Sequence, residues 1–96
     1  MEKLTVKEFI KLADSDILKE VYAKLVALRM EYEIHNTTAF DSESFELCYH
    51  IATDTIKKAK LTKIQLCGSI IHQSQELEQI GFNRQDLLNV AGLNIE

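Results

Sequence analysis

The chain has 96 residues, a formal net charge of −4 and a pI near 5.3. This length predicts one helical domain over residues 1–96, which buries roughly 60–65% of the surface of its unfolded chain. An acidic chain has no general attraction to phosphates, and no apolar stretch reaches the roughly 18 residues of a membrane span. We therefore expect a soluble protein that does not associate with membranes.

The first residues and the two cysteines indicate a compartment. No apolar segment follows a basic start, so no secretory signal is visible. Cys48 and Cys67 are too few for a disulfide framework, and we expect both to be free thiols. These features predict a cytoplasmic location.

Proline and glycine, which form many of the turns in β-rich folds, are scarce. The chain has no proline and three glycines, Gly68, Gly81 and Gly92, which is too few for the turns of a β-rich fold. The sequence predicts an all-α fold: a compact bundle of about five helices, with one long central helix and short N- and C-terminal helices.

The N-terminal segment carries a helix start signal. Thr5 and Glu8 form a Thr-x-x-Glu capping box, and Leu4 and Phe9 are spaced as a hydrophobic staple. We predict a first helix over residues 6–13.

The most regular apolar pattern runs over residues 17–34, behind N-cap residues at 14–16. One seam consists of Leu18, Val21, Leu25, Leu28 and Tyr32. Tyr22, Val26 and Met30 widen the apolar arc beyond half of the circumference. A surface helix has a narrower stripe, so this helix is either the central one or carries a second face for a partner, and a homodimer through it is one such case.

Residues 35–44 lack periodicity and are rich in turn-forming side chains, which predicts a loop with Phe40 folded back onto the core. Asp41, Ser42 and Ser44 can each cap the helix that follows. The residues expected to face inward on that helix are Phe45, Cys48, Ile51, Ala52, Ile56 and Ala59.

The lysine-rich stretch is "TIKKAKLTKIQ", residues 55–65. The apolar stripe before it and the stripe after it differ by about a quarter turn at 100° per residue. We predict a break at Leu61–Thr62, with Thr62 and Gln65 as the capping box of the next helix. A continuous bent helix is the alternative.

The next helix is predicted over residues 63–80, with a strand over 63–71 as the alternative. Gly68 within it suggests a close helix contact. Its inward stripe is expected to consist of Ile64, Cys67, Ile70, Ile71 and Leu77.

The last helix is short. Gly81 is placed to end the helix before it, with Phe82 as its hydrophobic follower. Asn83 and Asp86 then cap a helix that runs to about Ala91.

No sequence signature of catalysis is present: the chain has no Gly-rich phosphate loop and no GxSxG, HExxH or CxxC motif. Four residues have zinc-binding side chains, but two of them, Cys48 and His50, point about 160° apart on a helix. The others are Cys67 and His72. We predict no enzyme, no metal and no cofactor.

Two pairs at helical spacing could form half of a metal or acid–base site, Glu31 with His35 and Glu46 with His50. Such pairs are more typical of neighbours on a helix surface. A Cys–His nucleophilic pair needs a partly exposed thiol, and both cysteines occupy apolar positions.

Charge is segregated along the middle of the chain. Residues 30–55 contain six acidic residues and no lysine or arginine, and residues 57–63 contain four lysines and no acid. This pattern suits the helix dipole, and it also suits a two-signed surface that orients a charged partner. The expected partner-binding residues are Tyr22, Val26, Met30, Glu31, Glu33, Asp41, Glu43, Glu46, Lys57, Lys58, Lys60 and Lys63.

The sequence therefore predicts a small non-enzymatic module that binds another protein as a regulator, adaptor or inhibitor, a type frequent among phages and mobile elements. The alternative is a helical nucleic-acid-binding protein that uses the basic cluster Lys57–Lys63. Net acidity and the lack of a recognition helix argue against nucleic acid as the partner.

Overall fold

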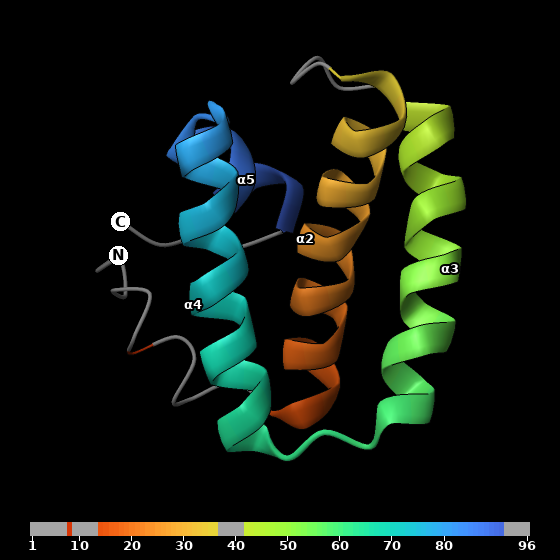
Figure 1. Cartoon of the computed structure of the whole chain (residues 1–96). Helices are drawn as coiled ribbons and strands as arrows, with labels where there is room; N and C mark the ends of the chain where they lie inside the picture. Colours follow the sequence, from red (N-terminus) through yellow and green to blue (C-terminus); the bar gives the residue numbers. More distant parts are fainter. Residues whose placement is uncertain (1–7, 9–13, 37–41, 92–96) are drawn as a thin grey trace.

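The computed structural model describes residue 8 and residues 14–36 and 42–91 (Figure 1). Four helices lie in these ranges: α2 (Ser15–His35), α3 (Ser42–Ala59), α4 (Lys63–Ile80) and α5 (Arg84–Ala91). The prediction of a compact all-α fold is confirmed, with four helices described where about five were expected. Of the expected helix over 6–13, only Glu8 is described, and it is helical. None of the described helices is long and apolar enough to cross a membrane.

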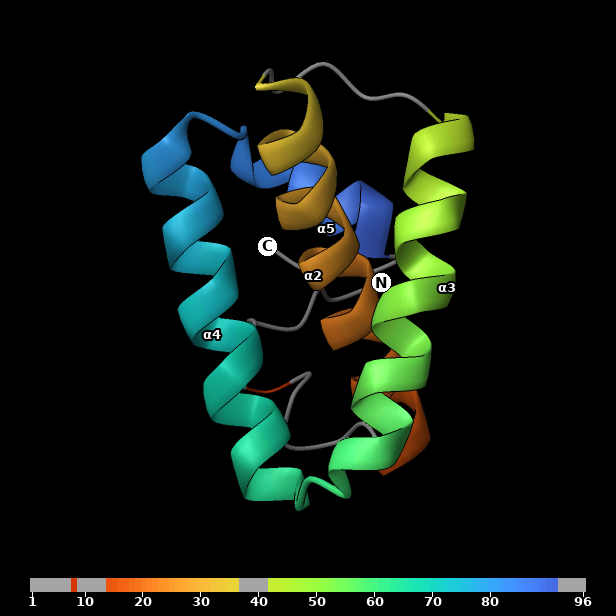
Figure 2. The same cartoon turned by 45° about the vertical axis from the view of Figure 1, so that its right-hand side comes forward.

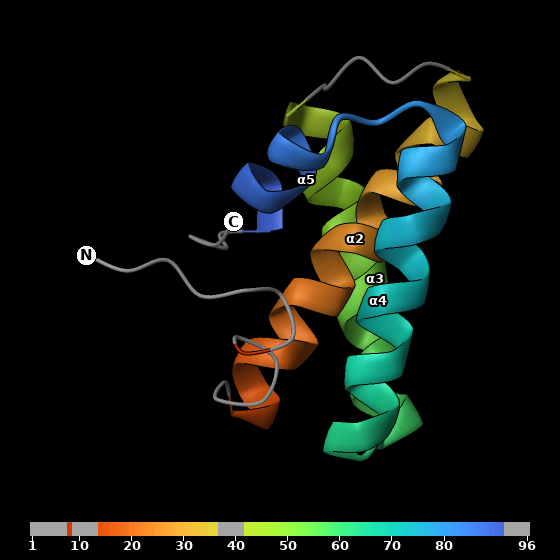
Figure 3. The ribbon, with the colours of Figure 1, turned by 90° about the vertical axis from the view of Figure 1, so that its left-hand side faces the viewer.

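The long helix α2 lies between α3 and α4 (Figure 2). The chain runs in opposite directions in α2 and α3, and in the same direction in α2 and α4 (Figure 1). The short helix α5 packs on one side of this layer, near the end where α2 terminates (Figure 3). α2 is therefore the central helix of the described structure.

Leucine and isoleucine side chains from α2, α4 and α5 form the main core. Four of the five residues predicted as the α2 seam are buried, and Tyr32 is half-buried with its ring edge-on to Phe82 at a centroid distance of 6.3 Å. The buried members of this cluster are Leu18, Val21, Leu25, Leu28, Leu66, Ile70, Leu77, Leu87 and Leu88.

A second, smaller cluster joins α2 to α3. Ala23, Ala52 and Ile56 are its buried members, and the small side chains let the two helices approach closely. The widened apolar arc of α2, consisting of Tyr22, Val26 and Met30, packs against this cluster. The second apolar face of α2 is therefore covered by α3 of the same chain.

The start and end of α2 follow from local hydrogen bonds. The Asp14 carboxylate accepts a hydrogen bond of 2.9 Å from the amide of Ile17, as an N-cap does. At the other end Asn36 adopts a left-handed conformation, and its amide donates to the Tyr32 carbonyl at 2.7 Å. The helix is thus slightly longer than the predicted 17–34.

The predicted break after α3 is confirmed. Lys60 has a φ of 50°, in the left-handed region, and this residue turns the chain out of α3. Thr62 then caps α4: its hydroxyl accepts from the Gln65 amide at 3.2 Å, and the Gln65 side chain accepts from the Thr62 amide at 2.9 Å. The alternatives of one bent helix and of a strand over 63–71 are wrong.

α4 ends in a Schellman motif, in agreement with the prediction that Gly81 ends this helix. The amide of Phe82 donates to the Leu77 carbonyl at 3.0 Å, and the amide of Gly81 donates to the Glu78 carbonyl at 3.1 Å. Asn83 then caps α5 by accepting from the Gln85 amide at 2.8 Å. The local signals in this segment were sufficient to define both helix ends.

For several residues, the predicted orientation toward the core or toward solvent is wrong. Ile51 of α3 and Ile64 of α4 were expected to face inward, but they are 50% and 85% exposed, and Ala59 is also exposed. Ala52 packs toward α2 in the cluster with Ala23 and Ile56. Because successive residues of a helix point about 100° apart, Ile51 is turned toward solvent. Leu66, which was not predicted to face inward, is fully buried. Phe40 lies outside the described residues.

Gly68 does not mark a close helix contact. It is exposed, and a Cβ atom built at this position meets nothing within 4 Å. The replacement Gly68→Ala should therefore stabilise the protein by about 0.5–1 kcal/mol, because alanine loses less backbone entropy in a helix. The measurement is the free energy of unfolding in urea.

Gly81 is the matched control for Gly68. Its φ is 126°, which a residue with a side chain rarely adopts, so Gly81→Ala should destabilise the protein by about 1 kcal/mol or more. A loss of stability in Gly68→Ala would mean that this segment packs differently from the structure.

Candidate interaction surface

The acidic residues that were expected in the partner-binding surface lie in different environments. Glu31 lies in α2 and is only 3% exposed, and its charge is close enough to the Cys48 thiol to influence it. Asp41 lies outside the described residues. Glu33 is exposed on α2, where it contacts an arginine of the same helix.

That arginine, Arg29, links α2 to α4. Its guanidinium donates to Glu33 at 3.2 Å and to the Glu76 carboxylate of α4 at 2.8 Å, and these hydrogen bonds raise the pKa of Arg29, with Glu76 the larger cause. The other Glu76 oxygen lies 3.1 Å from Nε2 of His72. Glu33 is therefore part of a chain of charged contacts between two helices of the same protein.

The acidic residues that remain on the surface of α3 are Glu43, Glu46 and Asp54, all exposed. Glu43 lies in the first turn of the helix and Lys57 and Lys58 in its last turn. These positions suit the helix dipole, which favours acids at the start and bases at the end. Acidic residues thus extend along α3 as far as Asp54, and the lysines follow at its end.

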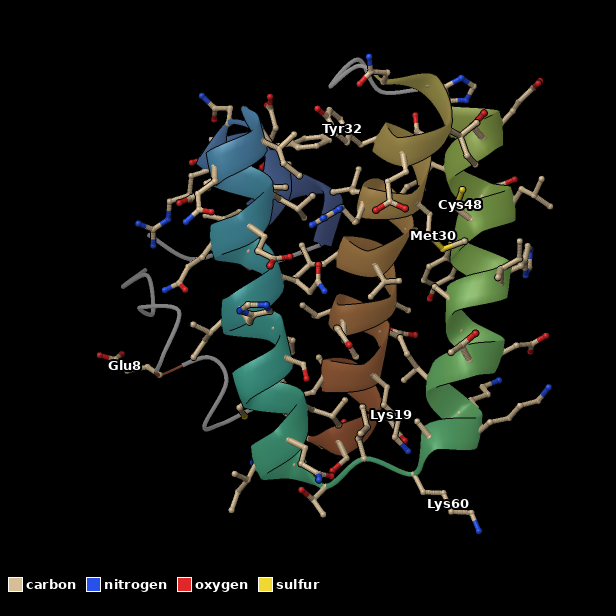
Figure 4. The ribbon with its side chains drawn as sticks, in the orientation of Figure 1. Glu8, Lys19, Met30, Tyr32, Cys48 and Lys60 are labelled. Atoms are coloured by element: carbon tan, nitrogen blue, oxygen red, sulfur yellow. The ribbon has the colours of Figure 1, made fainter. Side chains whose placement is uncertain are left out.

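The four lysines of the basic cluster surround the turn between α3 and α4. Lys57 and Lys58 end α3, Lys60 forms the turn and Lys63 begins α4, and all four are exposed. Figure 4 shows Lys60 pointing away from the body of the protein at this turn. The structure thus brings the predicted lysines together at one end of the bundle.

Two large apolar side chains lie exposed on the outer side of α3. Leu47 is 65% exposed and Ile51 is 50% exposed. They lie four residues apart and are therefore neighbours on the helix surface. Among the exposed large apolar residues in the described ranges, only these two lie one turn apart on the same helix. Sequence reasoning missed Leu47 and placed Ile51 in the core, although their spacing of four was visible in the sequence.

The outer face of α3 combines this apolar pair with both signs of charge. The outer face of α3 consists of Glu43, Leu47, Ile51, Asp54 and Lys58. At 100° per residue, these five residues fall within a sector of about 80°, opposite the side that packs on α2.

A groove of about 350 Å³ lies between α2 and α3. Lys19, Tyr49, Thr53 and Lys57 contribute to its lining, together with two carboxylates from the start of α2. Both signs of charge are mixed within it.

The zinc-ligand candidates lie apart. Cys48 is buried in α3, near enough to Glu31 of α2 for that charge to act on its thiol, whereas Cys67 and His72 belong to α4. In the part of the chain that the structure describes, no three His, Cys, Asp or Glu side chains are grouped so that they could hold a metal ion. Of the two acid–histidine pairs, His35 has its Nε2 within 2.9 Å of the Ser44 hydroxyl, which joins α2 to α3.

The two thiols should differ in reactivity. Burial raises the pKa of the Cys48 thiol, and the negative charge of Glu31 raises it further. Because the thiolate is the reactive form, Cys48 should be alkylated at least tenfold more slowly than half-exposed Cys67 at pH 8. The labelling rate of Cys48 should rise as the pH increases above 8.

Mass spectrometry of iodoacetamide adducts over time measures both rates. The variants Cys48→Ala and Cys67→Ala assign each rate to its residue. Equal rates for the two cysteines would contradict the burial of Cys48 between α2 and α3.

Comparison of the chain with family models, curated proteins and solved structures finds no match.

Proposed function

We propose that this protein is a small non-enzymatic interaction module, a regulator, adaptor or inhibitor, that binds a protein partner through the outer face of α3. The observation that carries the proposal is the exposed pair Leu47 and Ile51 on one helix. Apolar residues exposed singly are normal on protein surfaces, whereas adjacent ones flanked by charges are typical of contact surfaces.

The partner-binding surface proposed from the structure is narrower than the one expected from the sequence. Tyr22, Val26 and Met30 pack against α3, and Glu31 is buried. We therefore leave these four residues out of the proposed surface. Glu43 and Lys58 stay in it, since they lie on the outer face of α3, whereas Glu46 and Lys57 are exposed outside that face.

The charges next to the apolar pair provide orientation. Glu43 precedes Leu47, Asp54 follows Ile51, and Lys58 lies in the last turn of α3. A partner helix that lies along α3 meets opposite charges at its two ends, so only one direction of approach is favourable. The apolar pair supplies the buried centre of such a contact.

A capture experiment tests the proposal. The purified chain, immobilised, is incubated with extract of its native source, and bound proteins are identified by mass spectrometry. We expect a stoichiometric protein that is retained by the unaltered chain and lost with the double variant Leu47→Ser, Ile51→Ser.

The matched control is Ile64→Ser, which removes the most exposed of these apolar side chains from a different helix. This variant should retain the partner. Capture of no protein by the unaltered chain, or equal capture by the double variant, would contradict the proposal.

A nucleic-acid-binding function is the second candidate, because four exposed lysines gather at the turn between α3 and α4. Such binding should weaken steeply with salt as counterions are released. An electrophoretic mobility assay with duplex DNA and RNA at low salt tests it. A shift abolished by Lys57→Glu with Lys60→Glu would favour this function over protein binding.

A further inference from the structure

The groove between α2 and α3 has the size and the lining of a small-molecule site. Its volume of about 350 Å³ lies at the lower end of the roughly 300–1,000 Å³ range of ligand pockets. α3 contributes Tyr49, Thr53 and Lys57, which are spaced four residues apart and form one row on the helix. Buried Ile56 lies beside this row. The α3 side of the groove therefore combines apolar surface with a positive charge.

The charged side chains of the groove do not neutralise one another. The first two turns of α2 contribute Asp16, Lys19 and Glu20, and α3 contributes Lys57. Within the ranges that the structure describes, none of these four side chains takes part in an ion pair or in a side-chain hydrogen bond. Ionised groups of both signs are therefore available to a ligand that enters the groove.

A hydroxyl group of the groove lacks a hydrogen bond. The Thr53 Oγ1 atom is buried, and it has no hydrogen-bond partner among the described residues. A buried hydroxyl without a partner is costly, so a ligand that supplies one is favoured at this position. The unpaired hydroxyl thus points to a ligand independently of the charges.

We infer that this groove binds a small zwitterion, an amino acid with a large apolar side chain. The carboxylate of the ligand pairs with the two lysines, and its ammonium group pairs with the two carboxylates of α2. Its side chain packs against Tyr49 and Ile56. The site is additional to the proposed function, because the groove lies on a different flank of α3 from the outer face.

Other kinds of ligand fit the groove less well. An anion without a positive group would meet Asp16 and Glu20, and a cation without a negative group would meet Lys19 and Lys57. A neutral apolar molecule would remove water from all four charges without replacing it. A zwitterion offers each charge of the groove a group of the opposite sign.

The probe for this site is L-phenylalanine. Phenylpropanoate lacks its ammonium group and phenethylamine lacks its carboxylate, so these two molecules are matched controls. Backbone amide shifts in NMR spectra of the full chain give the affinities as each molecule is added to about 50 mM. We expect a dissociation constant on the order of 1 mM for phenylalanine, because about twelve non-hydrogen atoms at ordinary ligand efficiency reach this range. Both controls should bind at least about fivefold more weakly.

Two variants test the role of each charge. Lys57→Gln should weaken the binding of phenylalanine and phenylpropanoate about fivefold, and it should not weaken that of phenethylamine. Glu20→Gln should weaken phenylalanine and phenethylamine to a similar extent, and it should not weaken phenylpropanoate.

The matched control variant is Lys60→Gln. It removes the same charge next to the end of α3, but from a side chain that points away from the protein (Figure 4). All three affinities should stay within about twofold, because salt screens a charge that lies outside the groove.

Thr53→Val separates binding from folding. Valine replaces the unpaired hydroxyl with a methyl group of similar shape, so the midpoint of thermal unfolding should stay unchanged or rise. The affinity for phenylalanine should nevertheless fall about threefold, because a hydrogen bond to the ligand is lost. A structural role of the hydroxyl alone would leave the affinity unchanged.

Three results would overturn the inference. The first is the absence of amide shifts at the groove with phenylalanine at the highest concentration. The second is equal binding of phenylalanine and its two controls. The third is an equal loss of affinity in Lys57→Gln and Lys60→Gln, which would indicate attraction by net charge alone. None of these results bears on the proposed function, which concerns the outer face of α3.

Discussion

Replacement of Leu25 by alanine should lower the free energy of unfolding by about 2–5 kcal/mol. Leu25 lies in the main core between α2, α4 and α5 and is only 2% exposed. The change removes apolar contacts and leaves a cavity that the three surrounding helices can fill only in part. For a domain with roughly 5–15 kcal/mol of stability, this is a large fraction of the total.

Urea unfolding followed by circular dichroism measures this effect, and Leu47→Ala is the matched control. Leu47 is the same residue type on a described helix, but it is exposed, so its replacement should change the stability by no more than about 0.5 kcal/mol. Similar losses in the two variants would mean that α2 is not the central helix.

The replacement Ala52→Leu should lower the free energy of unfolding by about 1–3 kcal/mol, because it overpacks the close contact between α2 and α3. Ala52 is buried against the same cluster as Ala23. The added atoms require α3 to shift outward or side chains to leave their preferred rotamers. Either response weakens the contact that turns Leu47 and Ile51 toward solvent.

Gln75→Leu is the control for this change, since it adds a leucine at an exposed position of α4 and should stay within about 0.5 kcal/mol of the unaltered chain. Thermal and urea unfolding of both variants give the comparison. An Ala52→Leu protein as stable as the unaltered one would show that α3 does not pack closely on α2.

Helix boundaries were predictable because they depend on neighbouring residues. The Thr62–Gln65 capping box and the Gly81–Phe82 Schellman motif each form within six residues, so their sequence patterns are sufficient. The start of α2 at Asp14 follows in the same way.

Helix facing was less predictable because it depends on distant partners. α3 has two apolar stripes: one contains Cys48 and Ala52, and the other contains Leu47 and Ile51. The sequence placed Cys48, Ala52 and Ile56 in the core correctly, but it also placed Ile51 there, because hydrophobicity favours large side chains as core residues. The small residues Ala23 and Ala52 are buried together in the contact between α2 and α3, and this contact selects the first stripe.

The environment of charged residues was the least predictable feature. Acidic side chains are mostly exposed in proteins, so Glu31 was assigned to the surface. The structure buries it four residues after Ala27 and eight after Ala23, on a stripe of α2 where both alanines are buried. Glu33 meets Arg29, whose further contact with Glu76 depends on the packing of α2 against α4.

Photo-crosslinking at the outer face of α3 tests the central claim, which is that this face binds a protein. A benzophenone amino acid is placed at position 51, and at position 75 of α4 as the control. Each purified chain is irradiated alone and in extract of the native source. We predict a covalent protein adduct at position 51 and none at 75, with the mass of the adduct showing whether the partner is a second copy. No adduct at position 51, or equal adducts at both positions, would contradict the claim.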